Sequence, residues 1–178
     1  MEFEVLGWPP DAPAIDLDHE CFAYAGKFVM TGTGKAVARS NREIVAAAAF
    51  SADRTDERTL RCRYITVRDD MQANGFGSRL LRFVADRGNE RGFTDVLIAV
   101  NNPYAYVAAY RAGFAFTGEE TGLAEVVLAD GSPRDDQPYR DGLRSFLRSD
   151  MPDDAHAFVK RKLTDGVPKR VDLADSED

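Results

Sequence analysis

The stretch that decides the fold is Val67–Gly77, which reads Val-Arg-Asp-Asp-Met-Gln-Ala-Asn-Gly-Phe-Gly and runs on as Ser-Arg-Leu-Leu at 78–81. Residues 60–67 are rich in β-branched and aromatic side chains, which favours a strand. Residues 78–87 carry apolar side chains at helical spacing. The sequence therefore predicts a strand joined to a helix through a turn with two glycines. Such a turn suits a phosphate, because a helix start offers unpaired N–H groups and glycines permit close approach.

Two sequence patterns, in the expected order, resemble the GNAT superfamily of N-acetyltransferases. Gln72, Gly75 and Gly77 match its acyl-CoA pyrophosphate loop, in which Gln or Arg precedes x-x-Gly-x-Gly or Ala. Dinucleotide- and ATP-binding loops need other glycine spacings or a following Gly-Lys-Ser/Thr. After an apolar stretch at 96–100, the family's later Asn-x-x-Ala helix ending in Gly-Phe is matched by Asn102, Ala105, Gly113 and Phe114.

The resemblance implies an α/β fold of the α+β type, with a central twisted mixed sheet flanked by helices. One GNAT domain is expected over residues 1–163. The apolar patterns predict strands at 2–6, 35–39, 44–51, 60–67, 93–100, 114–119 and 123–129, and helices at 16–24, 78–87, 102–113 and 139–147.

The C-terminal part allows two interpretations. Asp153 and Asp154 precede the basic residues 160–162, which is the charge order of a helix dipole. Residues 157–163 also resemble the closing strand of many GNAT domains, and we favour the strand. Residues 131–152 would then be an insertion in the final hairpin beside the acceptor site, acting as a specificity lid or as a peripheral or dimer-forming helix. The acidic tail 164–178 is expected to be disordered.

For the cofactor, the resemblance implies acetyl-CoA as co-substrate and direct transfer of its acetyl group to a primary amine. Asn101 or Asn102 would hydrogen-bond one side of the pantetheine arm, and the strand edge Ile65, Thr66 and Val67 would pair with the other. The pyrophosphate would be held by backbone N–H groups of Gln72, Ala73, Asn74, Gly75, Phe76, Gly77 and Ser78.

The general acid is expected at Tyr110, although the sequence departs from the family there. The usual tyrosine of the superfamily falls at Ala109, and one step along a helix rotates a side chain by about 100°. Tyr110 can serve only if the helix is shifted locally. Tyr106 and Tyr104 are the substitutes, and the alternative is that all three tyrosines are packing residues.

The general base stays open. Some relatives carry a glutamate on the strand before the loop, where this chain has Arg-Cys-Arg-Tyr at 61–64. Glu43, Asp53, Glu125 or an ordered water are the alternatives. The absent glutamate and the displaced tyrosine also leave a second function open, a non-catalytic domain that binds acyl-CoA as a sensor or partner subunit.

The charges indicate the environment of the protein. The chain has 30 Asp and Glu against 23 Lys and Arg, of which only 5 are Lys. Acid-rich, lysine-poor surfaces resemble those of haloarchaeal proteins, which suggests a halophilic protein; an ordinary acidic mesophile protein is the alternative. The net charge of -7 argues against nonspecific nucleic-acid binding.

Partners and location follow from the same composition. No apolar run approaches the ~20 residues that cross a bilayer, so we expect no membrane contact and a cytoplasmic protein. Cys21 and Cys62 are too few for a disulfide framework, and no metal site is expected. Superfamily members often dimerise, so a homodimer is a candidate assembly.

Overall fold

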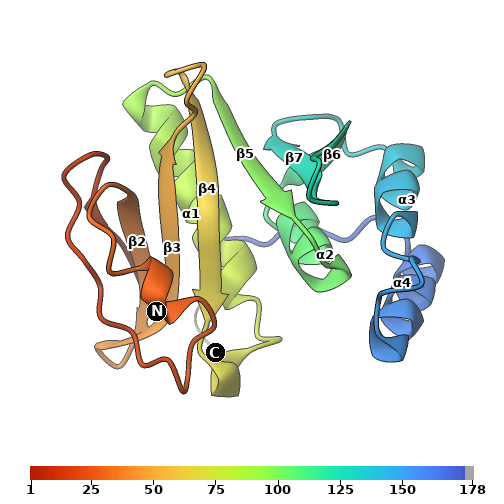
Figure 1. Cartoon of the computed structure of the whole chain (residues 1–178), viewed down its shortest axis with the longest axis horizontal. Helices are drawn as coiled ribbons and strands as arrows, with labels where there is room; N and C mark the ends of the chain where they lie inside the picture. The colour runs from red at the N-terminus through yellow and green to blue at the C-terminus, as the bar shows by residue number, and fades with distance from the viewer. Residues whose placement is uncertain (175–178) are drawn as a thin grey trace. The chain divides into compact units, whose positions relative to one another are not determined.

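The computed structural model of the chain describes residues 1–174 and contains both strands and helices, the mixed α/β fold that was predicted (Figure 1). It divides into two compact units. The N-terminal unit is Met1–Val96 together with residues 171–174, and the C-terminal unit is Leu97–Arg170. The single domain over 1–163 stays a prediction.

Four antiparallel strands form the sheet of the N-terminal unit. They are β1 (Glu2–Gly7), β2 (Gly34–Ser40), β3 (Glu43–Ala52) and β4 (Thr59–Val67), each paired with the next. The alanines at 46–49 of β3 are fully buried. Small side chains on both faces of this inner strand let the layers above and below approach closely.

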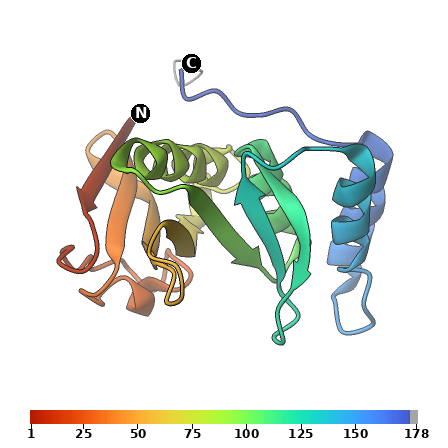
Figure 2. The same ribbon diagram turned by 90° about the horizontal axis from the view of Figure 1, so that it is seen from above.

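Helix α1 (Phe76–Arg91) covers one face of this sheet, as Figure 2 shows. Its apolar stripe is buried, which confirms the expected helix and extends it at both ends. A left-handed glycine, Gly92, with φ of 105°, ends the helix. Since α1 follows β4 through the glycine-containing turn, the predicted order of strand, turn and helix is confirmed.

The opposite face is covered by residues 13–33, here called the cover segment, and the helix predicted at 16–24 is wrong. Ile15 and Leu17 are buried at two-residue spacing, as in extended chain. The carboxylate of Asp18 accepts a hydrogen bond from the N–H of Glu20, which closes a turn. Tyr24 then adopts a left-handed φ of 59°, which a continuing helix does not allow. Only the 3-10 turn η1 (Ala25–Lys27) follows.

The C-terminal unit combines three antiparallel strands with three helices. β7 (Val126–Asp130) pairs with β6 (Phe114–Glu120) and with β5 (Asp95–Val100), whose first two residues belong to the other unit. The helices are α2 (Pro103–Arg111), α3 (Asp136–Arg144) and α4 (Asp153–Asp165). In this unit the strands expected at 93–100, 114–119 and 123–129 and the helices expected at 102–113 and 139–147 are confirmed, with β7 starting later and α3 ending earlier than predicted.

Residues 157–163 belong to helix α4, so the favoured strand is wrong. Ala155 and Val159 are buried one helical turn apart, and the acidic start and basic end match the helix dipole. The insertion proposed at 131–152 depended on a closing strand at 157–163. Because that segment is helical, 131–152 does not lie inside a final hairpin, and it contributes α3 instead.

A hydrogen bond from α3's unit holds the chain just after α4. Arg134 donates a hydrogen bond to the carbonyl oxygen of Pro168 at 2.7 Å. This contact fixes part of the tail expected to be disordered at 164–178, and residues 175–178 lie outside the described chain. No helix among residues 1–174 is both long and apolar enough to span a bilayer.

Candidate functional site

The glycine loop, residues 72–78, leaves a row of backbone N–H groups without partners. Ala73 and Gly75 both take left-handed φ values, 63° and 77°, and turn the chain into α1. The first helical hydrogen bond runs from the N–H of Arg79 to the carbonyl oxygen of Gly75, at 3.1 Å. Within the described chain, the N–H groups of residues 74–77 donate to no protein acceptor. They are available to an anionic ligand at the positive end of α1.

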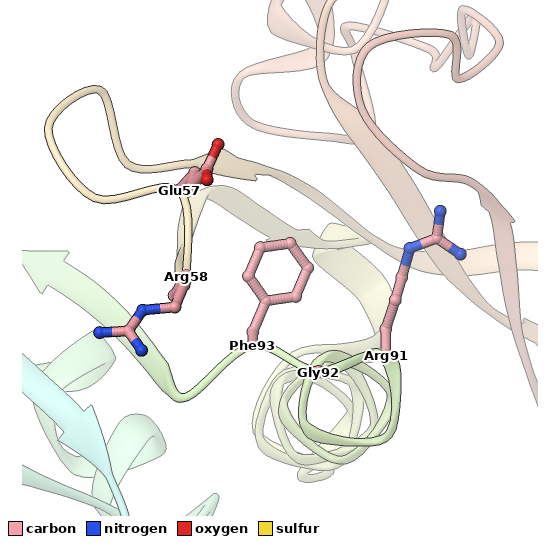
Figure 3. A pocket seen from close by; sticks show the side chains of 5 residues that line it. All are labelled: Glu57, Arg58, Arg91, Gly92 and Phe93. Atoms are coloured by element: carbon pink, nitrogen blue, oxygen red, sulfur yellow. The ribbon is translucent and has the colours of Figure 1, made fainter.

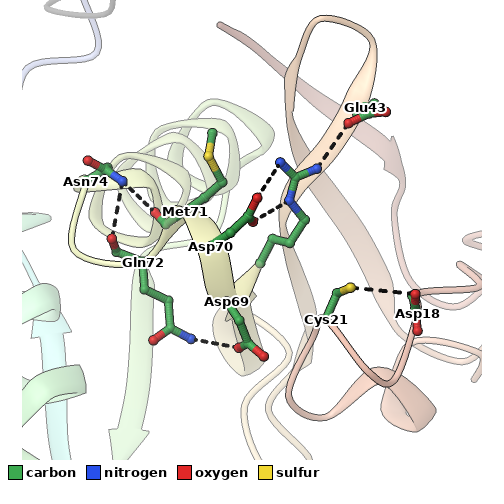
Figure 4. A network of polar contacts seen from close by, with 9 residues as sticks. Asp18, Cys21, Glu43, Asp69, Asp70, Met71, Gln72 and Asn74 are labelled. Carbon is green, nitrogen blue, oxygen red and sulfur yellow. Dashed lines mark hydrogen bonds and ion pairs between the residues drawn. The ribbon is translucent and has the colours of Figure 1, made fainter.

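Side-chain hydrogen bonds hold the loop in this shape (Figure 4). Nε2 of Gln72 donates to the Asp69 carboxylate at 3.1 Å. Nδ2 of Asn74 donates to the carbonyl oxygens of Met71 and Gln72 at 3.1 and 3.2 Å. The side chains of Gln72 and Asn74 are thus engaged in the loop itself, and the backbone remains for the ligand.

The loop is also tied to the cover segment. The N–H of Asp69 donates to the carbonyl oxygen of Cys21 at 2.9 Å. Next to it, Arg68 bridges the carboxylates of Asp70 and Glu43, at 2.6 and 3.1 Å. The start of the loop is therefore fixed by β3 and by the segment on the sheet face opposite α1.

Arg79 adds a cation to the loop, which sequence reasoning missed. Its guanidinium donates to the carbonyl oxygen of Asn74 at 3.3 Å and lies 5.7 Å from the centre of the Phe76 ring. Arg79 follows Gly75 by four residues, so both lie on the same side of the first helical turn. That spacing was the available signal.

The end of β4 lies close to the start of α1 and carries a buried hydroxyl group without a partner in the described chain. A Cβ on Gly77 would lie 3.3 Å from Cγ2 of Val67, closer than an ordinary contact, so glycine at residue 77 favours the close approach of the helix start to the strand. The hydroxyl of Thr66 is buried and has no hydrogen-bond partner within residues 1–174. The role predicted for Ile65, Thr66 and Val67 beside the pantetheine arm stays a prediction.

A β-bulge on β4, not foreseen from the sequence, lies just before this segment. Ala49 pairs with Tyr64 and Phe50 pairs with Cys62, so Arg63 is the extra residue. Bulges leave that residue outside the ladder and are common beside active sites. Arg63 donates from Nε to the Ser51 hydroxyl at 2.8 Å, and Arg61 pairs with Asp53.

The contacts of the candidate residues do not identify any of them as the general base. The Thr55 hydroxyl and the Arg61 guanidinium hold the pKa of Asp53 well below its usual range. Asp53 also lies at the opposite end of β4 from Val67, about 26 Å along the strand. Glu43 pairs with Arg68, and Glu125 in the C-terminal unit accepts a hydrogen bond from Thr121.

The three tyrosines of α2 differ sharply in exposure. Tyr110 is fully buried, its hydroxyl oxygen accepts the N–H of Phe116 at 2.9 Å, and burial raises its pKa. Tyr106 is also fully buried and donates to the carbonyl oxygen of Tyr139 at 2.9 Å. Tyr104 is 45% exposed and donates to the carboxylate of Asp154. The contacts of Tyr110 are those of a packing residue.

Asn101 and Asn102 precede α2, and their side chains differ in their hydrogen bonds. Oδ1 of Asn102 accepts the N–H of Ala105 at 2.8 Å, which makes Asn102 the helix N-cap, and its Nδ2 donates to Asn101. Asn101 is exposed, and its own side-chain amide donates to no described residue. Of the two, Asn101 has the free donor.

Two shallow pockets of the N-terminal unit lie away from the glycine loop. One is lined by Glu57, Arg58, Arg91, Gly92 and Phe93, and Figure 3 shows Arg58 directed away from the Phe93 ring. The other is formed by residues 53–58. Gly92 ends α1 and Gly75 precedes it, so the first pocket is about 24 Å along the helix from the loop.

Comparisons with known proteins agree on one family. The model of the Acetyltransferase (GNAT) family matches residues 4–114, more than half of the chain. An acetyltransferase from Bacillus subtilis, solved in complex with CoA, is similar at 13% identity and a TM-score of 0.56, with 72% of this chain and 96% of that chain covered.

Two further solved structures are similar over about half of the chain. An IAA acetyltransferase from Bacillus cereus has 17% identity and a TM-score of 0.46, covering 55% of this chain and 77% of its own. The ribosomal-protein-S18-alanine N-acetyltransferase from Escherichia coli has 19% identity and a TM-score of 0.45, covering 55% and 68%. No curated protein sequence matches the chain.

Proposed function

Because the chain belongs to the GNAT family of acetyltransferases, we propose that this acyltransferase moves an acetyl group from acetyl-CoA to a primary amine by direct attack of the amine. The observation that carries the proposal is the glycine loop, which presents the unpartnered N–H groups of residues 74–77 at the start of α1. Acetyl-CoA supplies a thioester that an amine can attack without a covalent enzyme intermediate.

The grip on the co-substrate would come from the loop. The N–H groups of residues 72–78 would hold the pyrophosphate, and the Arg79 guanidinium would add charge beside them. The edge of Ile65–Val67 would pair with the pantetheine arm, with the Thr66 hydroxyl as a further donor. The role of Asn101 or Asn102 beside the arm stays a prediction. These side chains orient the arm and keep water from it.

The acyl oxygen would be stabilised at the bulge of β4. Arg63 stands outside the strand register, and its backbone N–H would be the donor to the negative charge that develops on the acyl oxygen during attack. A donor fixed in a strand needs no rearrangement at the moment of reaction, which is why such groups lower a barrier effectively.

We propose that water, and not a side chain, takes part in both proton transfers, to the thiolate and from the amine. Tyr110 stays the predicted general acid, but a buried hydroxyl that already accepts a backbone N–H supports a packing role instead. The thiolate would then take its proton from water, and an ordered water would accept the proton of the amine.

Four further properties are proposed. They are the class of acceptor, the salt concentration at which the protein works, its compartment and its oligomeric state. A primary amine is the acceptor class, and the chain leaves its identity open. The 30 acidic residues support a halophilic, haloarchaeal protein that works at high salt in the cytoplasm. A homodimer is proposed because members of the superfamily often dimerise, and light scattering tests this assembly.

The test is a calorimetric titration of acetyl-CoA and of CoA into the purified protein, at low and at molar salt. Binding is expected, more tightly at molar salt if the protein is halophilic. Release of CoA thiol with a panel of amines then measures turnover. Absence of binding by the folded protein under both conditions would refute the proposed co-substrate. Binding without turnover across the panel would favour the non-catalytic alternative.

A further inference from the structure

Lys27 has a fixed position on the cover segment. Its N–H donates to the carbonyl oxygen of Tyr24 at 2.8 Å, and the next residue, Phe28, is fully buried. Its Nζ lies over the ring of Tyr64, 5.6 Å from the ring centre, and Tyr24 packs against the same ring at 5.9 Å. The amine of Lys27 is therefore held over β4 although the residue is exposed.

No carboxylate pairs with this amine. In a chain with 30 acidic residues and 5 lysines, Lys27 forms no ion pair within residues 1–174. Lys162, by comparison, pairs with Asp165, and the buried Lys35 donates to the carbonyl oxygen of Met30 and to Thr33. No acidic residue of the described chain therefore engages the Nζ of Lys27.

The amine also lies over the strand that leads to the glycine loop. Tyr64 precedes Val67 by three residues, about 10 Å along the strand, and the unpartnered Thr66 hydroxyl lies on the same sheet face as Tyr64. The cover segment contacts the turn just before the loop through the hydrogen bond from the N–H of Asp69 to the carbonyl oxygen of Cys21. On the proposed function, an arm that pairs with Ile65–Val67 brings its acyl end to Tyr64 and the bulge at Arg63.

We propose that Lys27 is an internal acyl acceptor, a self-acetylation site of this protein. The inference rests on the proposed function, since acetyl-CoA supplies the acetyl group. The neutral Nζ forms a C–N bond with the acetyl carbon and the thioester C–S bond breaks. Sulfur keeps the electron pair, and the proton lost by nitrogen ends on the CoA thiol. Lys35, the other lysine of the N-terminal unit, is fully buried and cannot compete.

The first experiment is incubation of the protein with acetyl-CoA, followed by intact-mass measurement and peptide mapping. We expect one acetyl group per chain, on Lys27, at a first-order rate that does not depend on protein concentration. Excess CoA should slow the reaction, and Lys27→Arg, which keeps the cation over Tyr64, should remove it. Equal labelling of Lys160, Lys162 and Lys169 would overturn the proposal, because it would indicate chemical acetylation in solution.

A second experiment does not depend on turnover. Trace labelling with acetic anhydride measures the reactivity of each lysine with and without CoA. CoA is expected to lower labelling of Lys27 at least fivefold and to leave Lys169 unchanged. If calorimetry shows CoA binding while Lys27 is neither acetylated nor protected, the inference on Lys27 fails and the proposed function stands. If CoA does not bind, the proposed function fails and the inference on Lys27 fails with it.

Discussion

A Cβ on Gly77 would lie 3.3 Å from Cγ2 of Val67, the last residue of β4. This distance is shorter than an ordinary van der Waals contact, so a side chain at residue 77 would push the start of α1 away from the strand. The row of unpartnered N–H groups in the glycine loop would move with it. The close approach of these two residues connects the packing of the sheet to the proposed binding of CoA.

We therefore expect Gly77→Val to weaken CoA binding at least about tenfold, near 1.4 kcal/mol, in a calorimetric titration. Gly26→Ala is the matched control, because a Cβ there meets nothing within 4 Å. Equal CoA affinity in Gly77→Val and the wild type would show that the loop does not hold the co-substrate.

Arg79→Gln tests the cation beside the loop. Loss of its charge and of the contact with Asn74 should weaken CoA binding by about fivefold, near 1 kcal/mol, and should make binding less dependent on salt. Arg87→Gln on the same helix is the control, since Arg87 pairs with Glu90 and not with the loop. If both variants bind CoA alike, Arg79 has no part in binding.

Tyr110→Phe separates packing from catalysis. Removal of the hydroxyl leaves the N–H of Phe116 without its acceptor, so the free energy of unfolding should fall by about 1–3 kcal/mol. Tyr104→Phe, at an exposed residue, should change it by less than about 1 kcal/mol. CoA affinity should be unchanged in both.

Rates measured below the melting temperature then decide the role of Tyr110. A large fall in kcat for Tyr110→Phe, with CoA affinity and the folded fraction kept, would establish Tyr110 as the general acid. An unchanged kcat with reduced stability is the result that its burial predicts.

The turn between β3 and β4 should respond to pH. Because Thr55 and Arg61 lower the pKa of Asp53 in the folded state, the ionised carboxylate stabilises the fold above the ordinary pKa of aspartate. That stabilisation is lost as the pH falls through the lowered folded-state pKa. Asp53→Asn should therefore unfold at a lower temperature than wild type at pH 7, and the difference should shrink toward pH 2.

Asp11→Asn is the control for this pH series, since Asp11 is exposed and its carboxylate has no described hydrogen bond. A gap between Asp53→Asn and wild type that stays constant from pH 7 to pH 2 would mean that the Asp53 contacts do not stabilise the fold.

Substitutions of two alanines distinguish a helix at α4 from a strand. Ala155 is buried and Ala157 is exposed, as helical geometry requires when Val159 is buried. Ala155→Asp should cost at least about 3 kcal/mol of unfolding free energy, because it buries an unpaired charge. Ala157→Asp should cost little in chemical denaturation. In a strand, residue 157 would lie on the same face as Val159, so Ala157→Asp would be costly as well.

The sequence by itself determined the path from β4 through the glycine loop into α1, and the N-cap of α2 at Asn102. These features are local: glycine supplies the left-handed conformation, the change of apolar period marks the passage from strand to helix, and a side-chain oxygen caps the helix that it precedes. The same local pattern carried the resemblance to GNAT, which the family comparison confirmed.

Only the tertiary structure decided the conformation of the cover segment, the bulge at Arg63, the burial of Tyr110 and the helix at 153–165. In each case the outcome depends on residues distant in the chain. The apolar residues 15–28 pack on a sheet face, and Tyr110 is enclosed by residues of β6 and α3. The spacing of apolar residues indicates which side chains become buried. The surface against which they pack then determines the backbone conformation and the direction of the Tyr110 side chain.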